Sequence, residues 1–181
     1  ITHVIAIERC GPSRDGAPRD ARGIDITSHN APLDRLFNGG SWTTIGIGDL
    51  GNEIGMGSLP HDLVARHIKG GDALWCRVPC DYPLVGGVSN WAGAALLGAI
   101  SLLWHRPAES MLDSIRPEFG RRLLEAAVLN GGAVASDRAG GTPRPQLFVD
   151  GQPWCVLEQV HREIYDACLH LMRTDRRMLS P

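Results

Sequence analysis

The sequence lacks both a long hydrophobic run and an excess of positive charge. Its most apolar segment, residues 91–104, is shorter than the roughly 20 apolar residues that a membrane-spanning helix needs, so we expect no membrane partner. The chain has 18 Lys and Arg against 20 Asp and Glu, a net charge of -2, whereas binding to a phosphate backbone usually needs a basic surface. We therefore expect no nucleic-acid partner either.

Paired cysteines and familiar catalytic motifs are also missing. The five cysteines are scattered and include no CxxC pair, which argues against a disulfide framework or a zinc site and favours a reducing compartment such as the cytoplasm. Because HExxH, GxSxG and GxxxxGK(S/T) are absent, the sequence predicts neither a zinc protease, nor an α/β-hydrolase, nor a P-loop protein. No signal peptide is visible at the start of the chain.

The segments that are present predict an α/β domain with helices packed on a sheet. The 181 residues, 43% of them hydrophobic, can bury a core, and apolar runs alternate with segments of helical period. An Asp-Gly pair between two apolar runs predicts a C-terminal β-hairpin followed by a helix. We expect a buried strand at residues 3–7, strands at 43–47 and 73–78, helices at 31–37, 60–68, 91–104 (capped by Asn90), 117–129 and 158–172, and hairpin strands at 146–149 and 153–156.

The first candidate site is the glycine-rich stretch at residues 46–57, which follows the second expected strand. Asp49, Asn52 and Glu53 offer two carboxylates and an amide, and Gly51 lets the backbone approach a ligand. These groups could hold a hard cation, or orient a polar substrate with one carboxylate as a base. The alternative is a glycine-rich turn with solvated carboxylates. A GxGxxG string here is a weak dinucleotide signal, because later glycines and a proline interrupt the helix that such a site requires.

Two other loops carry polar groups. Glu8 and Arg9 follow the first strand, and Asp15 and Arg22 lie in the long loop behind it, so a guanidinium could clamp an acidic substrate. Surface ion pairs that hold the loop are the alternative interpretation.

A third group lies where the apolar helix at residues 91–104 is expected to begin. Ser89 and Asn90 follow two glycines there, and the free N–H groups of a helix N-terminus favour a carboxylate or phosphate. Ordinary helix capping by either side chain is the alternative interpretation.

Five strings combine order and spacing in a specific way. They are IERCG at residues 7–11, DG at 15–16, ARGIDIT at 21–27, GIGDLGNEIGMG at 46–57 and GGVSNWAG at 86–93. Together they resemble the D-glutamate cyclase family, and weaker similarity extends this resemblance over nearly the whole chain. Members of that family carry a further N-terminal segment, so we expect residues 1–181 to form a single D-glutamate cyclase-like domain that lacks it.

The resemblance implies an enzyme that converts D-glutamate into 5-oxo-D-proline and water, in a bacterial cytoplasm or, in a eukaryote, in mitochondria. The substrate amine must lose a proton and attack a carboxylate, which calls for a base and for stabilisation of an oxyanion. We expect a catalytic group of Glu8, Asp49, Asn52 and Glu53, and a substrate-binding group of Arg9, Asp15, Arg22, Gly51, Ser89 and Asn90.

Several points stay open at this stage. No cofactor is required, although a divalent metal, Mg²⁺ or Mn²⁺, on Asp49 and Glu53 is compatible with the residues. A homo-oligomer is also compatible with the sequence. The alternatives to a cyclase are a metal-dependent phosphohydrolase, because clustered carboxylates and helix N-termini also suit phosphate esters, and a non-catalytic module that binds an acidic ligand.

Overall fold

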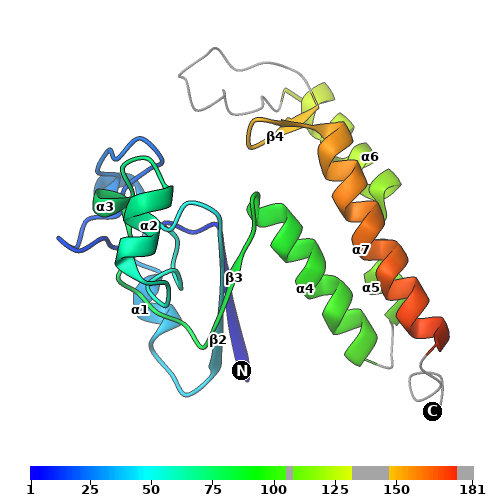
Figure 1. Ribbon diagram of the computed structural model, residues 1–181, viewed down its shortest axis with the longest axis horizontal. Helices are drawn as coiled ribbons and strands as arrows, with labels where there is room; N and C mark the ends of the chain where they lie inside the picture. The colour runs from blue at the N-terminus through cyan, green and yellow to red at the C-terminus, as the bar shows by residue number, and fades with distance from the viewer. Residues whose placement is uncertain (105–107, 132–146, 175–181) are drawn as a thin grey trace. The chain divides into compact units, whose positions relative to one another are not determined.

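The computed structural model describes residues 1–104, 108–131 and 147–174. These residues belong to two compact units, Ile1–Ala92 and Gly93–Pro181, and the boundary falls inside helix α4 (Ser89–Leu103) (Figure 1). Each unit is described here by itself. Within the described ranges, no helix combines the length and the hydropathy that a membrane span requires.

A three-stranded parallel sheet organises the first unit. Its strands β1 (His3–Ile7), β2 (Thr43–Gly48) and β3 (Tyr82–Val85) lie in the order β1-β2-β3. Ile7 is paired with Ile47, so the first two strands end side by side. The loops that leave these carboxyl ends therefore start from one edge of the sheet, which is where ligand sites form in open parallel sheets. The α/β prediction and the first two predicted strands are confirmed.

The prediction that β1 is a buried strand is wrong. Ile5 and Ile7 are 42% and 55% exposed, because only the other face of β1 packs on the core. Val4 and Ala6 supply that packed face. The buried residues of this core come mainly from the loops between strands: Phe37, Ile54, Met56, Cys76 and Val78.

The predicted third strand at residues 73–78 is also wrong. Helix α3 (Gly71–Leu74) occupies its beginning, and β3 lies further along at Tyr82–Val85. Leu74, Cys76 and Val78 of this run are buried, but the run bonds to loops rather than to a strand. The Cys76 N–H, for example, donates to the Gly51 carbonyl at 2.7 Å.

Short helices fill the connections of the first unit. A 3₁₀ turn, η1 (Thr27–His29), and helix α1 (Asp34–Phe37) lie between β1 and β2. The helix predicted at residues 31–37 is thus reduced to its last turn, because its first residues form separate turns. Helix α2 (His61–His67) confirms the prediction at 60–68.

The second unit is mainly helical. The C-terminal β-hairpin is confirmed, with Asp150 and Gly151 at φ 49° and 73°, the left-handed values of a tight type I′ turn. Its second strand ends earlier than predicted because the last helix already begins at Trp154, and Gln146 of the first strand lies outside the described residues. The elements are α4, α5 (Ala108–Asp113), α6 (Pro117–Leu129), β4 (Phe148–Val149), β5 (Gln152–Pro153) and α7 (Trp154–Thr174).

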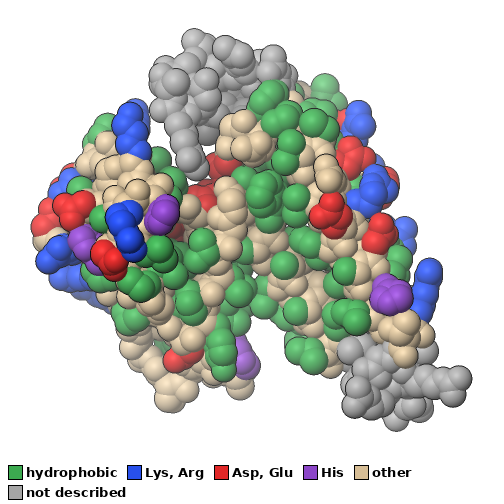
Figure 2. All heavy atoms as spheres, in the orientation of Figure 1, with side chains coloured by type: hydrophobic (Ala, Val, Ile, Leu, Met, Phe, Trp, Pro, Cys, Tyr) green, Lys and Arg blue, Asp and Glu red, His purple; other side chains and the backbone are tan. Residues whose placement is uncertain are grey.

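Helices α6 and α7 carry charges on their outer surfaces, which Figure 2 shows as red and blue along one edge. Arg162 Nη2 lies 3.0 Å from Glu158 Oε1 on its own helix and 3.8 Å from Glu118 Oε1 on α6. The predicted bounds of α6 are confirmed, but Phe119 and Leu123 on its apolar face are exposed rather than buried. One buried cluster of this unit contains Ala94, Leu112, Ile115 and Cys168.

Candidate active site

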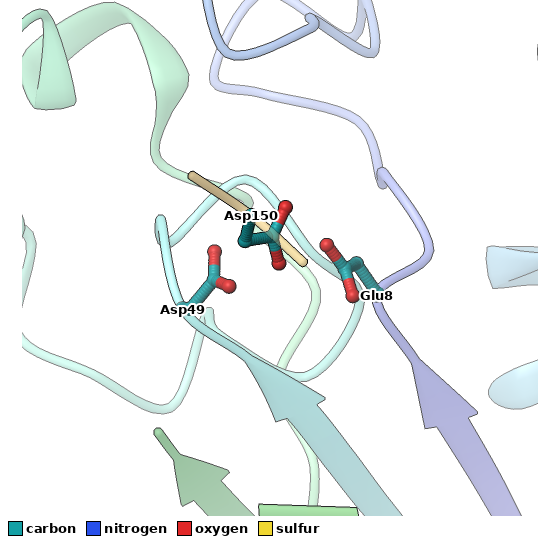
Figure 3. Close-up of side chains that lie close together, drawn as sticks. All are labelled: Glu8, Asp49 and Asp150. Carbon is teal, nitrogen blue, oxygen red and sulfur yellow. The ribbon is translucent and has the colours of Figure 1, made fainter. Parts of the chain in front are cut away.

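Two acidic side chains meet at the carboxyl ends of neighbouring strands. Glu8 follows β1 and Asp49 follows β2, and a carboxylate oxygen of one lies within 4.8 Å of a carboxylate oxygen of the other (Figure 3). The Glu8 N–H donates to the Ile47 carbonyl at 3.0 Å. This bond to β2 holds Glu8 in place, although its φ of 51° is unfavourable for residues other than glycine. Two carboxylates at this separation repel each other, and a shared cation or proton relieves the repulsion.

A buried carboxylate supports the backbone of this pair. Glu53 is 2% exposed, and its Oε1 accepts the N–H groups of Asp49 and Leu50 at 3.1 and 3.0 Å. Its Oε2 is buried without a hydrogen-bond partner and lies against Gly48, where a Cβ would be only 2.6 Å away. Glycine is therefore required at position 48 to leave room for this carboxylate.

The N-terminus of α4 binds a carboxylate of the chain itself. Ser89 is the first residue of this helix, and its N–H donates to Asp49 Oδ2 at 3.2 Å. The predicted N-cap Asn90 is therefore wrong, because it lies within the first turn, where it is exposed. The Ser89 side chain is fully buried, and its Oγ has no hydrogen-bond partner. The helix end does attract an anion, as its dipole favours, and Asp49 is that anion.

Asn52 joins the glycine-rich loop to the segment after β1. It is 4% exposed, and its Nδ2 donates to the Arg19 carbonyl at 2.8 Å and to Cys10 Sγ at 3.4 Å. Its backbone carbonyl accepts the Gly11 N–H at 2.9 Å, while its Oδ1 is buried without a partner. Burial, and next the nearby Glu53 carboxylate, raise the pKa of the Cys10 thiol. Sequence reasoning missed Cys10, whose only signal was its place beside two charged residues.

The two candidate arginines differ in their surroundings. Arg9 donates from Nη2 to the Ala31 carbonyl at 2.9 Å, and its buried Nε has no partner. Arg22 is largely exposed, and its Nε and Nη2 both donate to Asp20 Oδ2, at 2.9 and 2.7 Å. Arg22 thus uses its Nε and Nη2 donors inside its own loop, whereas the Nε donor of Arg9 has no partner.

Asp15 and Gly51 have structural partners of their own. Asp15 accepts the Ser13 hydroxyl at 2.7 Å and the Ala17 N–H at 3.1 Å, and it pairs with Arg19; these bonds hold the pKa of Asp15 well below its usual range. Gly51 has a φ of 84°, and a Cβ there would lie 2.6 Å from Val64 Cγ1, so only glycine fits. The structure thus brings together Glu8, Asp49, Glu53 and Ser89 through hydrogen bonds or proximity. It directs the Asn52 side chain to Arg19 and Cys10, and it ties Asp15 and Arg22 to their own loop.

The fold is that of an α/β protein with carboxylates at the ends of neighbouring parallel strands, the edge where open parallel sheets commonly bind small ligands. The family model for the C-terminal domain of D-glutamate cyclase-like proteins matches residues 1–165, and the chain belongs to this family. It is 41% identical over 106 residues to the human mitochondrial D-glutamate cyclase. That match covers 56% of this chain and 17% of the relative, so the chain corresponds to a small part of that protein.

Proposed function

We propose that this chain takes part in the cyclisation of D-glutamate to 5-oxo-D-proline with loss of water. The observation that carries the proposal is the family match over residues 1–165, a range that contains every residue of the candidate site. The relative named D-glutamate cyclase supports the same reaction. The geometry supports it as well, because the reaction needs a proton acceptor and anion-binding groups close together.

The reaction sets clear demands on the site. The α-nitrogen of D-glutamate bonds to the γ-carboxyl carbon, and one carbon–oxygen bond of that carboxyl breaks. The ammonium nitrogen begins with three protons and the lactam nitrogen keeps one, so two protons pass to the departing oxygen, which leaves as water. Holding the substrate in a folded conformation supplies much of the rate, because the attack is intramolecular.

In this proposal the Glu8–Asp49 pair binds the substrate ammonium and accepts its first proton. Two carboxylates within 4.8 Å attract a cation more strongly than one, and a cation between them relieves their repulsion. Asp49 is the better placed base because it is half-buried and fixed by the Ser89 N–H, whereas Glu8 is exposed. The exposed Glu8 guides the ammonium toward it.

The anionic groups of the substrate need donors. Arg9 has a buried Nε without a partner, and Ser89 has a buried Oγ without one, so both can bond a substrate carboxylate. Asn90 adds an exposed amide at the same helix end as Ser89. We propose that Arg9 holds the α-carboxylate and that Ser89 and Asn90 stabilise the oxyanion formed at the γ-carboxyl carbon.

A divalent cation is the alternative occupant of the Glu8–Asp49 pair, in place of the substrate ammonium. Carboxylate oxygens are the ligands that Mg²⁺ and Mn²⁺ prefer, and Asp49 together with Glu8 offers two of them within reach of one ion. Glu53 is a poorer ligand than the sequence suggested, because its Oε1 already accepts two N–H groups. Such an ion would supply Lewis acidity toward the carboxyl under attack. A mitochondrial or bacterial cytoplasmic location and a homo-oligomer stay predictions.

Proton NMR of the full-length protein that carries this chain tests the proposal. The protein is incubated separately with D-glutamate and L-glutamate, with EDTA or with added Mg²⁺ or Mn²⁺, and the signals of 5-oxoproline are followed. We expect product from the D-isomer. Binding of D-glutamate without product would instead favour a non-catalytic module, and metal-dependent phosphatase turnover without 5-oxoproline would favour a phosphohydrolase.

A further inference from the structure

We propose that Glu53 is a positioning residue, which acts on the reaction through Asp49 and is neither the base nor a metal ligand. This inference rests on the proposed function and assigns a role within the same site. The sequence suggested a central catalytic role for both carboxylates, because they lie four residues apart in one polar loop. The structure separates their roles through what each carboxylate bonds to.

Glu53 is directed at the backbone of its own loop. Its Oε1 accepts two consecutive N–H groups, those of Asp49 and Leu50, at 3.1 and 3.0 Å. Hydrogen bonds from backbone N–H groups to an ionised carboxylate are stronger than neutral ones and offset part of the cost of burying the charge. This arrangement fixes the turn in which the chain leaves β2, and so fixes the position of Asp49.

Asp49 then connects this turn to the next element. Its carboxylate accepts the Ser89 N–H at 3.2 Å, so Glu53 holds the backbone of Asp49 while α4 holds its side chain. A displacement of about 1 Å at a reacting group can lower a rate by orders of magnitude. Loss of the Glu53 bonds therefore impairs the reaction although Glu53 itself touches no substrate.

The second oxygen of Glu53 is also directed at its own loop. The side chain is 2% exposed, and its second oxygen lies against Gly48. Met56 lies beside the same glycine, with its Cγ 3.0 Å from the position of a Cβ there. A buried carboxylate enclosed by backbone and an apolar side chain is suited to support the loop, while the exposed Glu8 and half-buried Asp49 are accessible.

Two substitutions separate positioning from acid–base chemistry. Glu53→Gln keeps an oxygen acceptor at the same reach but removes the charge, whereas Glu53→Asp keeps the charge but withdraws it by one methylene. We expect Gln to retain kcat within about 10-fold and to leave the pKa values of the pH–rate profile unchanged, and Asp to lower kcat by about 100-fold. The opposite order, with Gln inactive and Asp active, would overturn the inference.

Amide hydrogen exchange gives a readout that does not depend on turnover. In Glu53→Asp we expect the Asp49 and Leu50 amides to exchange at least about 10-fold faster than in the parent protein, and in Glu53→Gln to remain protected. The Thr44 N–H is a matched control, because the Asp81 carboxylate accepts it at 2.8 Å elsewhere in the same sheet. Unchanged exchange at Asp49 and Leu50 in Glu53→Asp would also overturn the inference. A parent protein that makes no 5-oxoproline would refute the proposed function alone.

Discussion

Two loops of the first unit look alike in sequence and differ in structure. The loop at residues 10–25 and the loop at residues 48–58 are both rich in glycine and acidic residues. In the first, each aspartate bonds to a group at most four positions away: Asp15 to Ser13, Ala17 and Arg19, Asp20 to Arg22 and Ile24, and Asp25 to Thr27. These aspartates shape the loop itself and keep their charges near solvent.

The second loop bonds over long distances in sequence. Asn52 reaches Arg19, 33 positions away, and Asp49 reaches Ser89, 40 positions away. Two of its polar side chains also keep a buried atom without a partner, Asn52 Oδ1 and Glu53 Oε2. Buried polar atoms are nearly always bonded in folded proteins, so each of these two atoms has room for a further partner, such as a bound water or a ligand. The comparison teaches that bonding, rather than composition, separates a structural acidic loop from a candidate site.

The largest effect that tests this comparison is expected at Asp49. Asp49→Asn keeps the shape and an oxygen for the Ser89 N–H, but it removes the proton acceptor. We expect kcat for 5-oxoproline formation to fall by about 10²–10⁴-fold, the contribution of a positioned general base. The rate of product formation from D-glutamate, followed by NMR, measures the effect.

The matched control for this change is Asp25→Asn in the first loop. Asp25 accepts the Thr27 hydroxyl and N–H at 2.6 and 2.8 Å, so its side chain bonds within a local turn. Its substitution should leave kcat within about twofold of the parent value, as surface changes usually do. Equal losses in the two variants would refute the distinction between the loops.

A second pair of substitutions compares glycines that share one backbone conformation. Gly51 and Gly23 have φ values of 84° and 82°, but a Cβ meets Val64 at 2.6 Å in the first case and nothing within 4 Å in the second. Gly23→Ala should cost about 1–2 kcal/mol of unfolding free energy for the left-handed conformation. Gly51→Ala should cost a further amount of about 1–3 kcal/mol, because the core is overpacked. Urea denaturation measures the unfolding free energy of both variants. Equal losses would show that the glycine-rich loop can shift to make room for the added methyl group.

The sequence predicts those parts of the fold that depend on local patterns. Alternation and short apolar runs locate β1 and β2, and helical period locates α2, α6 and α7. The third strand was placed wrongly in this way. The apolar run at residues 73–78 is not a strand, because its backbone bonds to loops that are distant in sequence. An apolar run indicates that its residues are buried, but it does not indicate which segment their backbone bonds to. The same run therefore suits a strand or an extended segment that pairs with no strand.

The residue types of the candidate site could be predicted from the sequence, but the roles of these residues could be predicted only in part. Polar residues after β1 and β2 indicate a site because parallel strands end at one edge. No local pattern shows that the Ser89 N–H is used by Asp49, or that Glu53 turns toward the backbone, since both contacts depend on tertiary packing. The sequence left open whether Arg22 clamps a ligand or forms an ion pair that holds its loop, and the fold shows the ion pair, with Asp20.

A third pair of substitutions asks which arginine binds substrate. Arg9 keeps a buried Nε without a partner, whereas Arg22 is paired with Asp20 and largely exposed. We expect Arg9→Gln to raise KM for D-glutamate by about 10–100-fold, the loss of one hydrogen bond to a charged group. Arg22→Gln should change KM by less than about twofold. A larger effect at Arg22 would place the substrate against the first loop and reverse the comparison.

The smallest effect is expected from acid, and it concerns the first loop. The Ser13 hydroxyl, followed by the Ala17 N–H and Arg19, lowers the pKa of Asp15, and the Thr27 hydroxyl, followed by its N–H, lowers the pKa of Asp25. A carboxyl whose folded pKa is depressed stabilises the fold above its unfolded pKa of about 3.9, and this contribution is lost as the pH falls further. We therefore expect the loop to loosen only below about pH 4, and Ser13→Ala to raise the pKa of Asp15 while leaving that of Asp25 in place. Carboxyl-carbon NMR titration measures both values, and an Asp15 that titrates like a free aspartate in the parent protein would show that its charge is not held by the loop.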